Sequence, residues 1–341
     1  MKDVDILMLS QMAPVVVAGI DESFTLLRAW ETPDPDASIR ELAPHIRGLA
    51  QGGHGLIDGA LFDRLPKLEI VSSFGVGYDT IDAVEAARRG VIVTNTPDVL
   101  SDEVADLALG LLLATVRQLP QVDRYLRAGR WRDRPYPLTA TLRERKIGIL
   151  GLGRIGRAIA RRLEGFGVAV HYHGRRPQPD VAYAYHASLL AMAQAVDVLM
   201  IVAPGGPETD GIVDAAILEA LGPDGIVINV ARGSLVDEAA LVEALRSRKI
   251  HSAGLDVFAD EPRVPEGLLA LDHVVLLPHV GSGSIHTRAM MGRLLVDNLV
   301  SWFDGKGPLT PVPETPWPEP PSPEPPLPET SLPEAPSRGR P

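Results

Sequence analysis

The chain has 341 residues, of which 45% are hydrophobic and 23% charged, and its formal net charge is -11. This length allows two domains with separate cores, whereas the acidic balance argues against a nucleic-acid-binding surface. No apolar run reaches the roughly 18 residues that span a bilayer, and the lack of cysteine excludes disulfides, thiolate metal sites and a cysteine nucleophile.

The N-terminal sequence "MKDVDILMLS" is interpreted as a strand and not as a signal peptide, because acids interrupt its apolar stretch and it has no small-residue cleavage site. Short apolar runs predict further strands at 68–72 and 91–94, after a first one at 5–9. We expect a cytoplasmic protein with no nucleic-acid partner, no membrane partner and no bound metal.

The segment "DEVADLALGLLLATVRQ" predicts a helix over 102–118, with acids in its first turn and an arginine in its last. Apolar residues cover most of its circumference, so we expect it to be buried between larger bodies.

From residue 146 onward, predicted strands alternate with predicted helices. The strands are 146–150, 168–172, 196–202, 226–230, 252–257 and 274–277, and the helices are 157–164, 238–246 and 285–303. Such alternation is typical of a parallel sheet covered by helices on both faces. The last helix follows this sheet and should return to the first domain.

The C-terminal segment 311–341 contains thirteen prolines and is predicted to be an extended tail, because proline blocks both helices and ladders. An inert, solubilising tail is favoured over a ligand for a proline-reading domain. We therefore expect the folded part to end near residue 313.

A glycine-rich loop, Gly151-Leu-Gly-Arg-Ile-Gly156, lies between the strand "KIGIL" and the helix "RAIARRLEGF". In this context Gly151 permits a tight turn, Gly153 lets the backbone approach a pyrophosphate, and Gly156 allows close packing of helix on strand. The free N–H groups at the helix start would face the anion. The loop thus predicts a dinucleotide site, with a purely structural turn as the alternative.

The end of the second strand of this unit indicates which dinucleotide is bound. NAD sites carry an acid about 20 residues after the first glycine, but Gly174 occurs 23 residues after Gly151, and Arg175 and Arg176 follow it. An arginine can bind a 2′-phosphate through charge-assisted hydrogen bonds. We expect NADP(H) to be favoured and NAD(H) to be possible; an ordinary solvated turn is the alternative.

Three candidate catalytic residues follow later strands of the same sheet: Arg232 in "INVARGSLVDEAAL", Glu261 in "GLDVFADEP" and His279 in "VVLLPHVGSGS". Each also has a non-catalytic interpretation: Arg232 could form a surface ion pair, Glu261 could begin a turn before Pro262, and His279 could be an ordinary histidine. Open α/β sheets, however, bind ligands at the carboxyl ends of their strands, where all three converge.

The three residue types suit the reduction of a 2-oxo acid. Arginine offers a bidentate fork to a carboxylate and keeps its charge. Histidine can hold and release a proton near neutral pH, and a neighbouring carboxylate favours its protonated form and orients its ring. The cofactor would supply the hydride.

The sequence resembles the D-isomer-specific 2-hydroxyacid dehydrogenase family over about residues 5–313, and within it the NADP-dependent glyoxylate/hydroxypyruvate and hydroxyphenylpyruvate reductases. The resemblance is carried by "SSFGVGYDTID", "TPDVLSDEVADLALGLLLA", "GILGLGRIG", "NVARGSLVDEAALVEAL", "GLDVFADEP" and "LPHVGSGSIHTR". It implies that Arg232, Glu261 and His279 are catalytic, and that Val76 and Gly77 hold the substrate with Arg232 and His279.

The resemblance and the glycine-rich loop together predict one set of cofactor-binding residues. These are Gly151, Gly153, Arg154, Ile155, Gly156, Gly174, Arg175, Arg176, Ala203, Pro204, Val230, Ala231, Arg232, Asp256, His279 and Gly281.

We accordingly expect two Rossmann-like α/β domains. A cofactor domain at 101–282 is inserted into a discontinuous, flavodoxin-like substrate domain made of 1–100 and 283–313, followed by a disordered tail at 314–341. The cleft between the domains should hold a small 2-oxo or 2-hydroxy acid and close over hinges near 98–101 and 280–284. The apolar helix at 102–118 and the loop "WRDRPYPL" should form a homodimer interface.

The rival hypothesis is a dinucleotide-sensing interaction protein of the corepressor type, which would use the same fold and triad. The proline-rich tail favours it, whereas the acidic balance and the reductase-like motifs count against it. Turnover of glyoxylate or hydroxypyruvate would distinguish the two.

Overall fold

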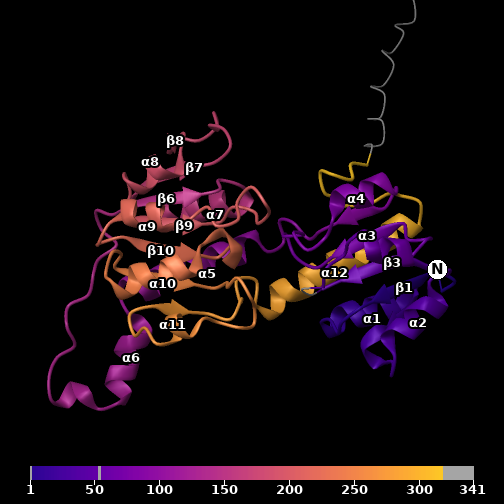
Figure 1. The fold of residues 1–341 in the computed structure, drawn as a ribbon, viewed down its shortest axis with the longest axis horizontal. Helices are drawn as coiled ribbons and strands as arrows, with labels where there is room; N and C mark the ends of the chain where they lie inside the picture. Colours follow the sequence, from indigo (N-terminus) through magenta and orange to yellow (C-terminus); the bar gives the residue numbers. More distant parts are fainter. Residues whose placement is uncertain (1, 53–54, 318–341) are drawn as a thin grey trace, which may run out of the picture.

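The structure, a computed structural model, describes residues 2–52 and 55–317. Two α/β domains lie side by side, and helix α12 (Ile285–Phe303) runs from one to the other (Figure 1). The predicted fold class, with one domain inserted into the other, is confirmed. Within the described ranges, no helix combines the length and the apolar character needed to cross a membrane.

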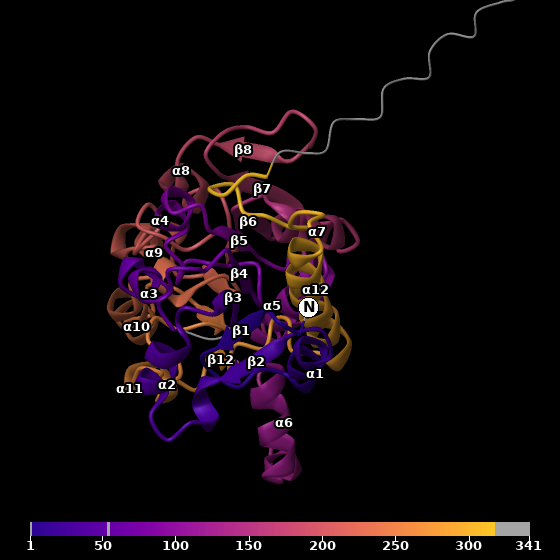
Figure 2. The same ribbon diagram turned by 90° about the vertical axis from the view of Figure 1, so that its right-hand side faces the viewer.

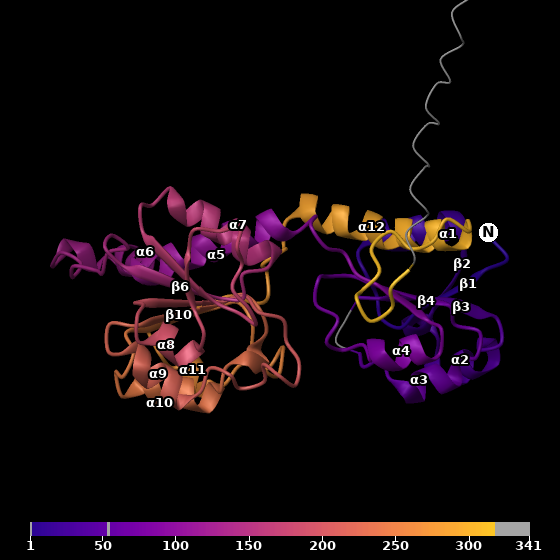
Figure 3. The ribbon, with the colours of Figure 1, turned by 90° about the horizontal axis from the view of Figure 1, so that it is seen from above.

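The first domain contains a parallel five-stranded sheet in the order β2-β1-β3-β4-β5, the flavodoxin-like order. Its strands are β1 Asp5–Met8, β2 Thr25–Arg28, β3 Ile46–Gln51, β4 Ile70–Ser73 and β5 Ile92–Thr94. Helices α1 (Pro14–Ser23) and α12 cover one face (Figure 3). The other face carries α2 Pro35–Leu42, α3 Gly59–Arg64 and α4 Ala83–Arg88.

The second domain contains a parallel seven-stranded sheet in the order β12-β11-β10-β9-β6-β7-β8. Its strands are β6 Lys146–Leu150, β7 Ala169–His173, β8 Ala184–His186, β9 Val198–Ile201, β10 Ile226–Asn229, β11 Ser252–Leu255 and β12 Val275–Leu276. The strands extend outward from β6 in one direction through β7 and β8, and from β9 in the other through β10, β11 and β12. Dinucleotides bind at such a switch point of the strand order, here between β6 and β9.

Two helical layers enclose this sheet (Figure 3). One is formed by α5 Ser101–Val116 and α7 Arg154–Glu164. The other is formed by α8 Leu189–Ala193, α9 Ala215–Leu221, α10 Glu238–Arg246 and α11 Glu266–Leu269. Helix α6 (Leu119–Arg127) projects away from both layers (Figure 2). The 3-10 turn η2 (Arg130–Arg132) follows it, and the other 3-10 turns are η1 Ala29–Glu31 and η3 Gly233–Leu235.

The predicted strands and helices all occur, with ends shifted by at most a few residues. The sequence analysis did not predict strands β2, β3 and β8 or most of the short helices. Strand β3 carries Gly48, which weakens a strand signal. The glycine is required by packing, because a Cβ there would lie 2.5 Å from Cδ1 of Ile6.

Helix α5 is buried, as its composition predicted, but the chain itself provides the cover. Its apolar side packs on α7 and on strands β10 and β11. Thr115 lies so close to β11 that a Cβ at Gly254 would be 2.4 Å from its hydroxyl oxygen. The apolar character of α5 is therefore explained within one chain and is not by itself an argument for a dimer.

The chain crosses between the domains just before α5 and just before α12, and one carboxylate joins these two places. Glu103 Oε2 accepts hydrogen bonds from Ser284 Oγ and Thr287 Oγ1, both at 2.9 Å. The start of α5 is thereby fixed to the start of α12. Hinges near 98–101 and 280–284 remain a prediction.

Packing continues a few residues beyond the predicted end of the folded part. Thr315 Oγ1 accepts a hydrogen bond from Val93 N at 3.0 Å, and the Trp317 ring contacts the Trp302 ring at a centroid distance of 5.0 Å. These contacts hold residues 314–317 against the edge of the five-stranded sheet. The tail was predicted at 314–341, and its residues 318–341 lie outside the described part of the chain.

Candidate active site

The three predicted catalytic residues follow neighbouring strands of the seven-stranded sheet. Arg232 follows β10, Glu261 follows β11 and His279 follows β12, and these strands are adjacent. Parallel strands end at one edge, so the three loops lie together on the side facing the first domain. The loop after β10 and the loop after β11 are in close contact at Gly233, where a Cβ would lie 1.9 Å from the carbonyl carbon of Phe258.

His279 and Glu261 form a hydrogen-bonded pair. His279 Nδ1 lies 2.7 Å from Glu261 Oε2, with 42% of the histidine side chain exposed and 15% of the glutamate side chain. The second carboxylate oxygen accepts from Phe258 N at 3.0 Å. Because an ionised carboxylate only accepts, Nδ1 carries a hydrogen and Nε2 is left to exchange a proton with a ligand.

The backbone of His279 is held in a conformation that non-glycine residues rarely adopt, with a φ of 53°. Its N–H donates to Asp256 O at 2.8 Å, and the Asp256 carboxylate accepts from the N–H groups of Val280 and Gly281, both at 2.8 Å. Burial raises the pKa of Asp256, and the two backbone donors oppose this. The carboxylate thus clamps the turn that presents His279.

Arg232 is oriented by three groups. Its Nε donates to Asp79 Oδ1 at 3.0 Å and to Oδ2 at 3.3 Å, and its Nη1 donates to Ala231 O at 2.8 Å. Buried Asn229 fixes the backbone beneath, because its Nδ2 donates to Arg232 O and its Oδ1 accepts from Ala231 N. The asparagine of the "NVARG" motif therefore builds the turn that carries the arginine.

The guanidinium of Arg232 reaches across to the predicted substrate loop of the first domain. A Cβ at Gly77 would lie 1.6 Å from Arg232 Nη2, so only glycine fits beside it. Asn95 Nδ2 donates to Val76 O at 2.8 Å and fixes this loop. Among the described residues, the N–H groups of Val76 and Gly77 have no hydrogen-bond partner, so both can bind an anion next to Arg232.

The structure places Arg232 against the substrate loop and His279 against Glu261. Over residues 2–52 and 55–317, no hydrogen bond joins the arginine to the histidine or the glutamate. A substrate between them would be held at its carboxylate end by one and reached at its oxygen by the other.

The glycine-rich loop has the form that a pyrophosphate site requires. Gly151 has a φ of 96°, and a Cβ there would lie 2.7 Å from the Cα of Ala203, while a Cβ at Gly156 would lie 2.2 Å from Gly151 O. Next to Gly153, in contrast, no atom lies within 4 Å of the Cβ position. Helix α7 begins there without a side-chain cap, so its first N–H groups can face a phosphate.

The corner next to strand β7 is basic. Arg175 and Arg176 are exposed, and neither has an ion-pair partner in the described part of the chain. The nearest acid, Asp180, is neutralised by Arg157 at 2.7 Å, and this hydrogen bonding lowers the pKa of Asp180. Around Gly174 no atom lies within 4 Å of a Cβ position, which leaves room for a ribose phosphate.

The other predicted cofactor residues lie in the phosphate loop or in segments that follow strands of the seven-stranded sheet. Arg154 begins α7, and its Nε pairs with Asp98 Oδ1 at 2.8 Å. The remaining ones are half-buried or buried at strand ends or in the loop, apart from exposed Pro204: Ile155, Ala203, Pro204, Val230, Ala231, Asp256 and Gly281.

Beside the substrate loop, Phe74 packs under a cation. The Arg288 guanidinium lies 5.5 Å from the centre of the Phe74 ring, and burial lowers the pKa of Arg288. Phe74 is also packed against the hydrophobic clusters of both domains.

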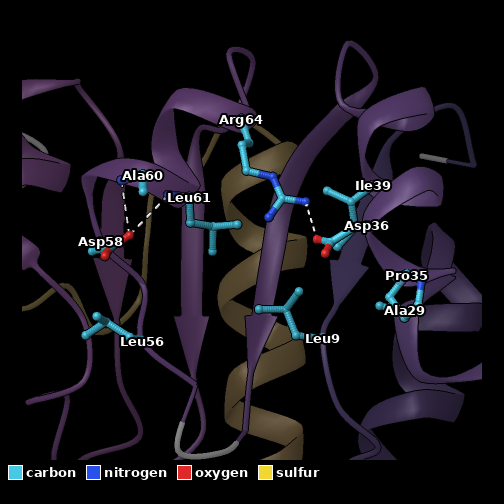
Figure 4. A pocket seen from close by; sticks show the side chains of 10 residues that line it. All are labelled: Leu9, Ala29, Pro35, Asp36, Ile39, Leu56, Asp58, Ala60, Leu61 and Arg64. Atoms are coloured by element: carbon cyan, nitrogen blue, oxygen red, sulfur yellow. Dashed lines mark hydrogen bonds and ion pairs between the residues drawn. The ribbon is translucent and has the colours of Figure 1, made fainter.

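A separate cavity of about 430 Å³ lies between α2 and α3 (Figure 4). An ion pair between Arg64 and Asp36, with an N–O distance of 2.7 Å, crosses it. None of its lining residues belongs to the predicted site, so it plays no part in the chemistry considered below.

Two residues that hold Arg232 in place were not predicted from the sequence, namely the acid Asp79 and the amide Asn229. Both occur in motifs that were quoted, "FGVGYD" and "INVARG". The sequence offered no signal that Asp79 would meet Arg232, because 153 residues separate them and they belong to different sheets.

The chain is similar to proteins of known family along most of its length. The family model for the D-isomer specific 2-hydroxyacid dehydrogenase NAD-binding domain matches residues 109–281. The hydroxyphenylpyruvate reductase of Plectranthus scutellarioides is 44% identical over 312 residues, which cover 92% of this chain and 100% of the relative. The glyoxylate/hydroxypyruvate reductase A of Arabidopsis thaliana has the same identity and coverage.

A solved structure gives the same likeness in three dimensions. The NADPH-dependent glyoxylate/hydroxypyruvate reductase of Sinorhizobium meliloti, in complex with NADP and malonate, superposes with a TM-score of 0.86 at 49% sequence identity. The match covers 92% of this chain and 98% of that one. The resemblance predicted from the motifs is thereby confirmed.

Proposed function

Because the chain belongs to the D-isomer specific 2-hydroxyacid dehydrogenase family, we propose that it reduces a small 2-oxo acid to the D-2-hydroxy acid with NADPH. Glyoxylate and hydroxypyruvate are the first candidates, because relatives that match nearly the whole chain are named for them. The observation that carries the proposal is the 2.7 Å bond between His279 Nδ1 and Glu261 Oε2, on loops adjacent to Arg232.

In the proposed mechanism, the substrate carboxylate binds the N–H groups of Val76 and Gly77 and the free edge of the Arg232 guanidinium. The chemistry required of a nicotinamide cofactor held there would be a hydride for the carbonyl carbon. His279 gives the proton on Nε2 to the carbonyl oxygen, so the products are the 2-hydroxy acid and the oxidised cofactor. Glu261 keeps Nδ1 protonated and the ring in place while the charge on the histidine changes.

Three features fit the chain to a dinucleotide. The space beside Gly153 is open, the first N–H groups of α7 have no side-chain cap, and Gly151 and Gly156 stand where a Cβ would clash with neighbouring backbone. We propose that Gly151, Gly153, Arg154, Ile155 and Gly156 hold the pyrophosphate. The other predicted cofactor residues would then contact the ribose phosphate and the nicotinamide half.

The cofactor preference is tested by replacing Arg175 and Arg176 together with serine. The Michaelis constant for NADPH should rise by about 10- to 100-fold, since charge-assisted hydrogen bonds to the 2′-phosphate contribute roughly 1.5–3 kcal/mol. The constant for NADH should change less than threefold. Arg161 and Arg246, exposed on α7 and α10, provide a matched double-serine control, and equal losses for both cofactors would contradict the assignment.

The activity itself is tested by following NADPH and NADH oxidation with glyoxylate, hydroxypyruvate and hydroxyphenylpyruvate. Turnover of at least one acid, faster with NADPH, is expected. Absence of turnover with both cofactors would refute the proposal. The alternative, a corepressor-type binding protein, gains no support from the relatives described above.

We also propose that the protein is a homodimer in the cytoplasm. The arm formed by α6 and residues 128–141 projects from the molecule (Figure 2). It exposes four large apolar side chains, namely Leu119, Leu126, Trp131 and Leu138. Such a protruding apolar surface needs a partner.

Replacing Trp131 and Leu138 with serine should weaken self-association by at least 10-fold, because each removes an exposed apolar anchor. Sedimentation velocity over a concentration series measures this. Leu269→Ser, at a similarly exposed position on α11, is the control. A wild-type protein that sediments as a monomer at micromolar concentration would contradict the dimer.

The division into a substrate domain at 1–100 and 283–313 and a cofactor domain at 101–282 is part of the proposal. It is supported by the two separate sheets, by the two crossings of the chain and by α12, whose far half packs against α1 and β4.

A further inference from the structure

One ion pair connects the two domains directly at the proposed active site. Asp79, in the loop after β4, accepts two hydrogen bonds from Arg232 Nε, at 3.0 and 3.3 Å. Both side chains are 31% exposed, so the pair is neither fully solvated nor sealed. No role has been given to Asp79 in the mechanism above.

The pair determines which edge of the guanidinium is available. Nε is used by Asp79, and one Nη1 hydrogen is used by Ala231 O at 2.8 Å. Nη2 has no hydrogen-bond partner within the described ranges. The edge formed by Nη1 and Nη2, directed at Gly77, is therefore the one that remains for a carboxylate.

The pair also lies in a space that only glycines leave open. A Cβ at Gly77 would be 3.0 Å from Asp79 Oδ1 and 1.6 Å from Arg232 Nη2. A Cβ at Gly205 would be 3.0 Å from Arg232 Cγ and 3.6 Å from Asp79 Cγ. The backbone of Gly77 and that of Gly205 restrict the position of the Arg232 side chain. The hydrogen bonds to the Asp79 carboxylate then restrict rotation of the guanidinium.

We propose that Asp79 is a positioning residue for the reaction: it holds Arg232 so that the Nη1–Nη2 edge faces the carboxylate of the 2-oxo acid. Because Asp79 lies in the loop after β4 of the first sheet and Arg232 in the turn after β10 of the second, this orientation requires the two domains to be together. Closure of the cleft and assembly of the carboxylate site are then one event.

This inference rests on the proposed function for its kinetic readout, but it also makes a binding prediction. Asp79→Asn keeps the shape of the side chain and removes its charge. It should lower kcat/KM for glyoxylate by about 10- to 100-fold, mostly through KM, because Arg232 binds the carboxylate in the ground state as well as in the transition state. The dissociation constant of oxalate for the NADPH complex should rise by a similar factor, while NADPH affinity stays within about twofold.

Two controls separate positioning from a general structural role. Asp63, on α3, forms an ion pair with Arg89 at 2.6 Å, remote from the site. Asp63→Asn removes an equivalent charge there and should change neither kcat/KM nor oxalate binding. In an Arg232→Gln background, Asp79→Asn should have less than a threefold further effect, because its action passes through the arginine.

The inference is overturned by any of three results. These are unchanged oxalate binding and kcat/KM in Asp79→Asn, an undiminished effect in the Arg232→Gln background, or an equal loss of NADPH affinity. If the wild-type complex binds oxalate through Arg232 and yet reduces no 2-oxo acid, the proposed function fails, and the oxalate comparison alone decides the role of Asp79.

Discussion

Replacing His279 with alanine should lower kcat by about 100- to 10,000-fold, the range that a general acid supplies. The change removes a side chain that is hydrogen-bonded to Glu261 through Nδ1 and is still 42% exposed. NADPH affinity should remain nearly unchanged, because the phosphate loop is built by other segments.

Single-turnover rates and NADPH fluorescence titrations measure the two quantities separately. His45→Ala, at an exposed histidine of the first domain, is the matched control. A loss of cofactor affinity as large as the loss in rate would contradict the role of His279 as a proton donor. The same result in the control would indicate a general effect on folding.

Arg232→Lys should lower kcat/KM for the 2-oxo acid by about 100- to 1,000-fold, although the positive charge is kept. Lysine cannot donate to Asp79 and to a substrate carboxylate in the fixed directions of a guanidinium. It also leaves the Ala231 carbonyl without its 2.8 Å donor. The loss should appear mostly in KM, since the arginine binds the carboxylate in the ground state as well as in the transition state.

The control for this change is Arg89→Lys. Arg89 is likewise bound to carboxylates through Nε and Nη1, at 2.8 Å to Glu85 and 2.6 Å to Asp63, but it lies on the surface of the first domain. Its replacement should cost little, as is usual for exposed ion pairs. Steady-state kinetics with both cofactors and a thermal melt for each variant are sufficient. Equal activity of Arg232→Lys and wild type would contradict the bidentate role.

The second domain was largely predictable, and its short-range signals explain why. Strand β6 and helix α10 have the predicted bounds, because apolar periodicity and end signals lie within each segment. In the first domain β2 and β3 were missed. Strand β3 contains Gly48, and only its packing against Ile6 shows why a glycine is needed in a central strand.

The sequence by itself predicted the chemistry that we propose for this protein: a phosphate loop, an arginine pair in place of an acid, and an arginine, a glutamate and a histidine at three strand ends. These signals are local, since each depends on a few neighbouring residues. Only the tertiary structure decided the arrangement between segments, such as the meeting of Asp79 with Arg232 and the cover of α5 by its own sheet. Such contacts depend on how two sheets pack, and no spacing along the chain encodes that distance.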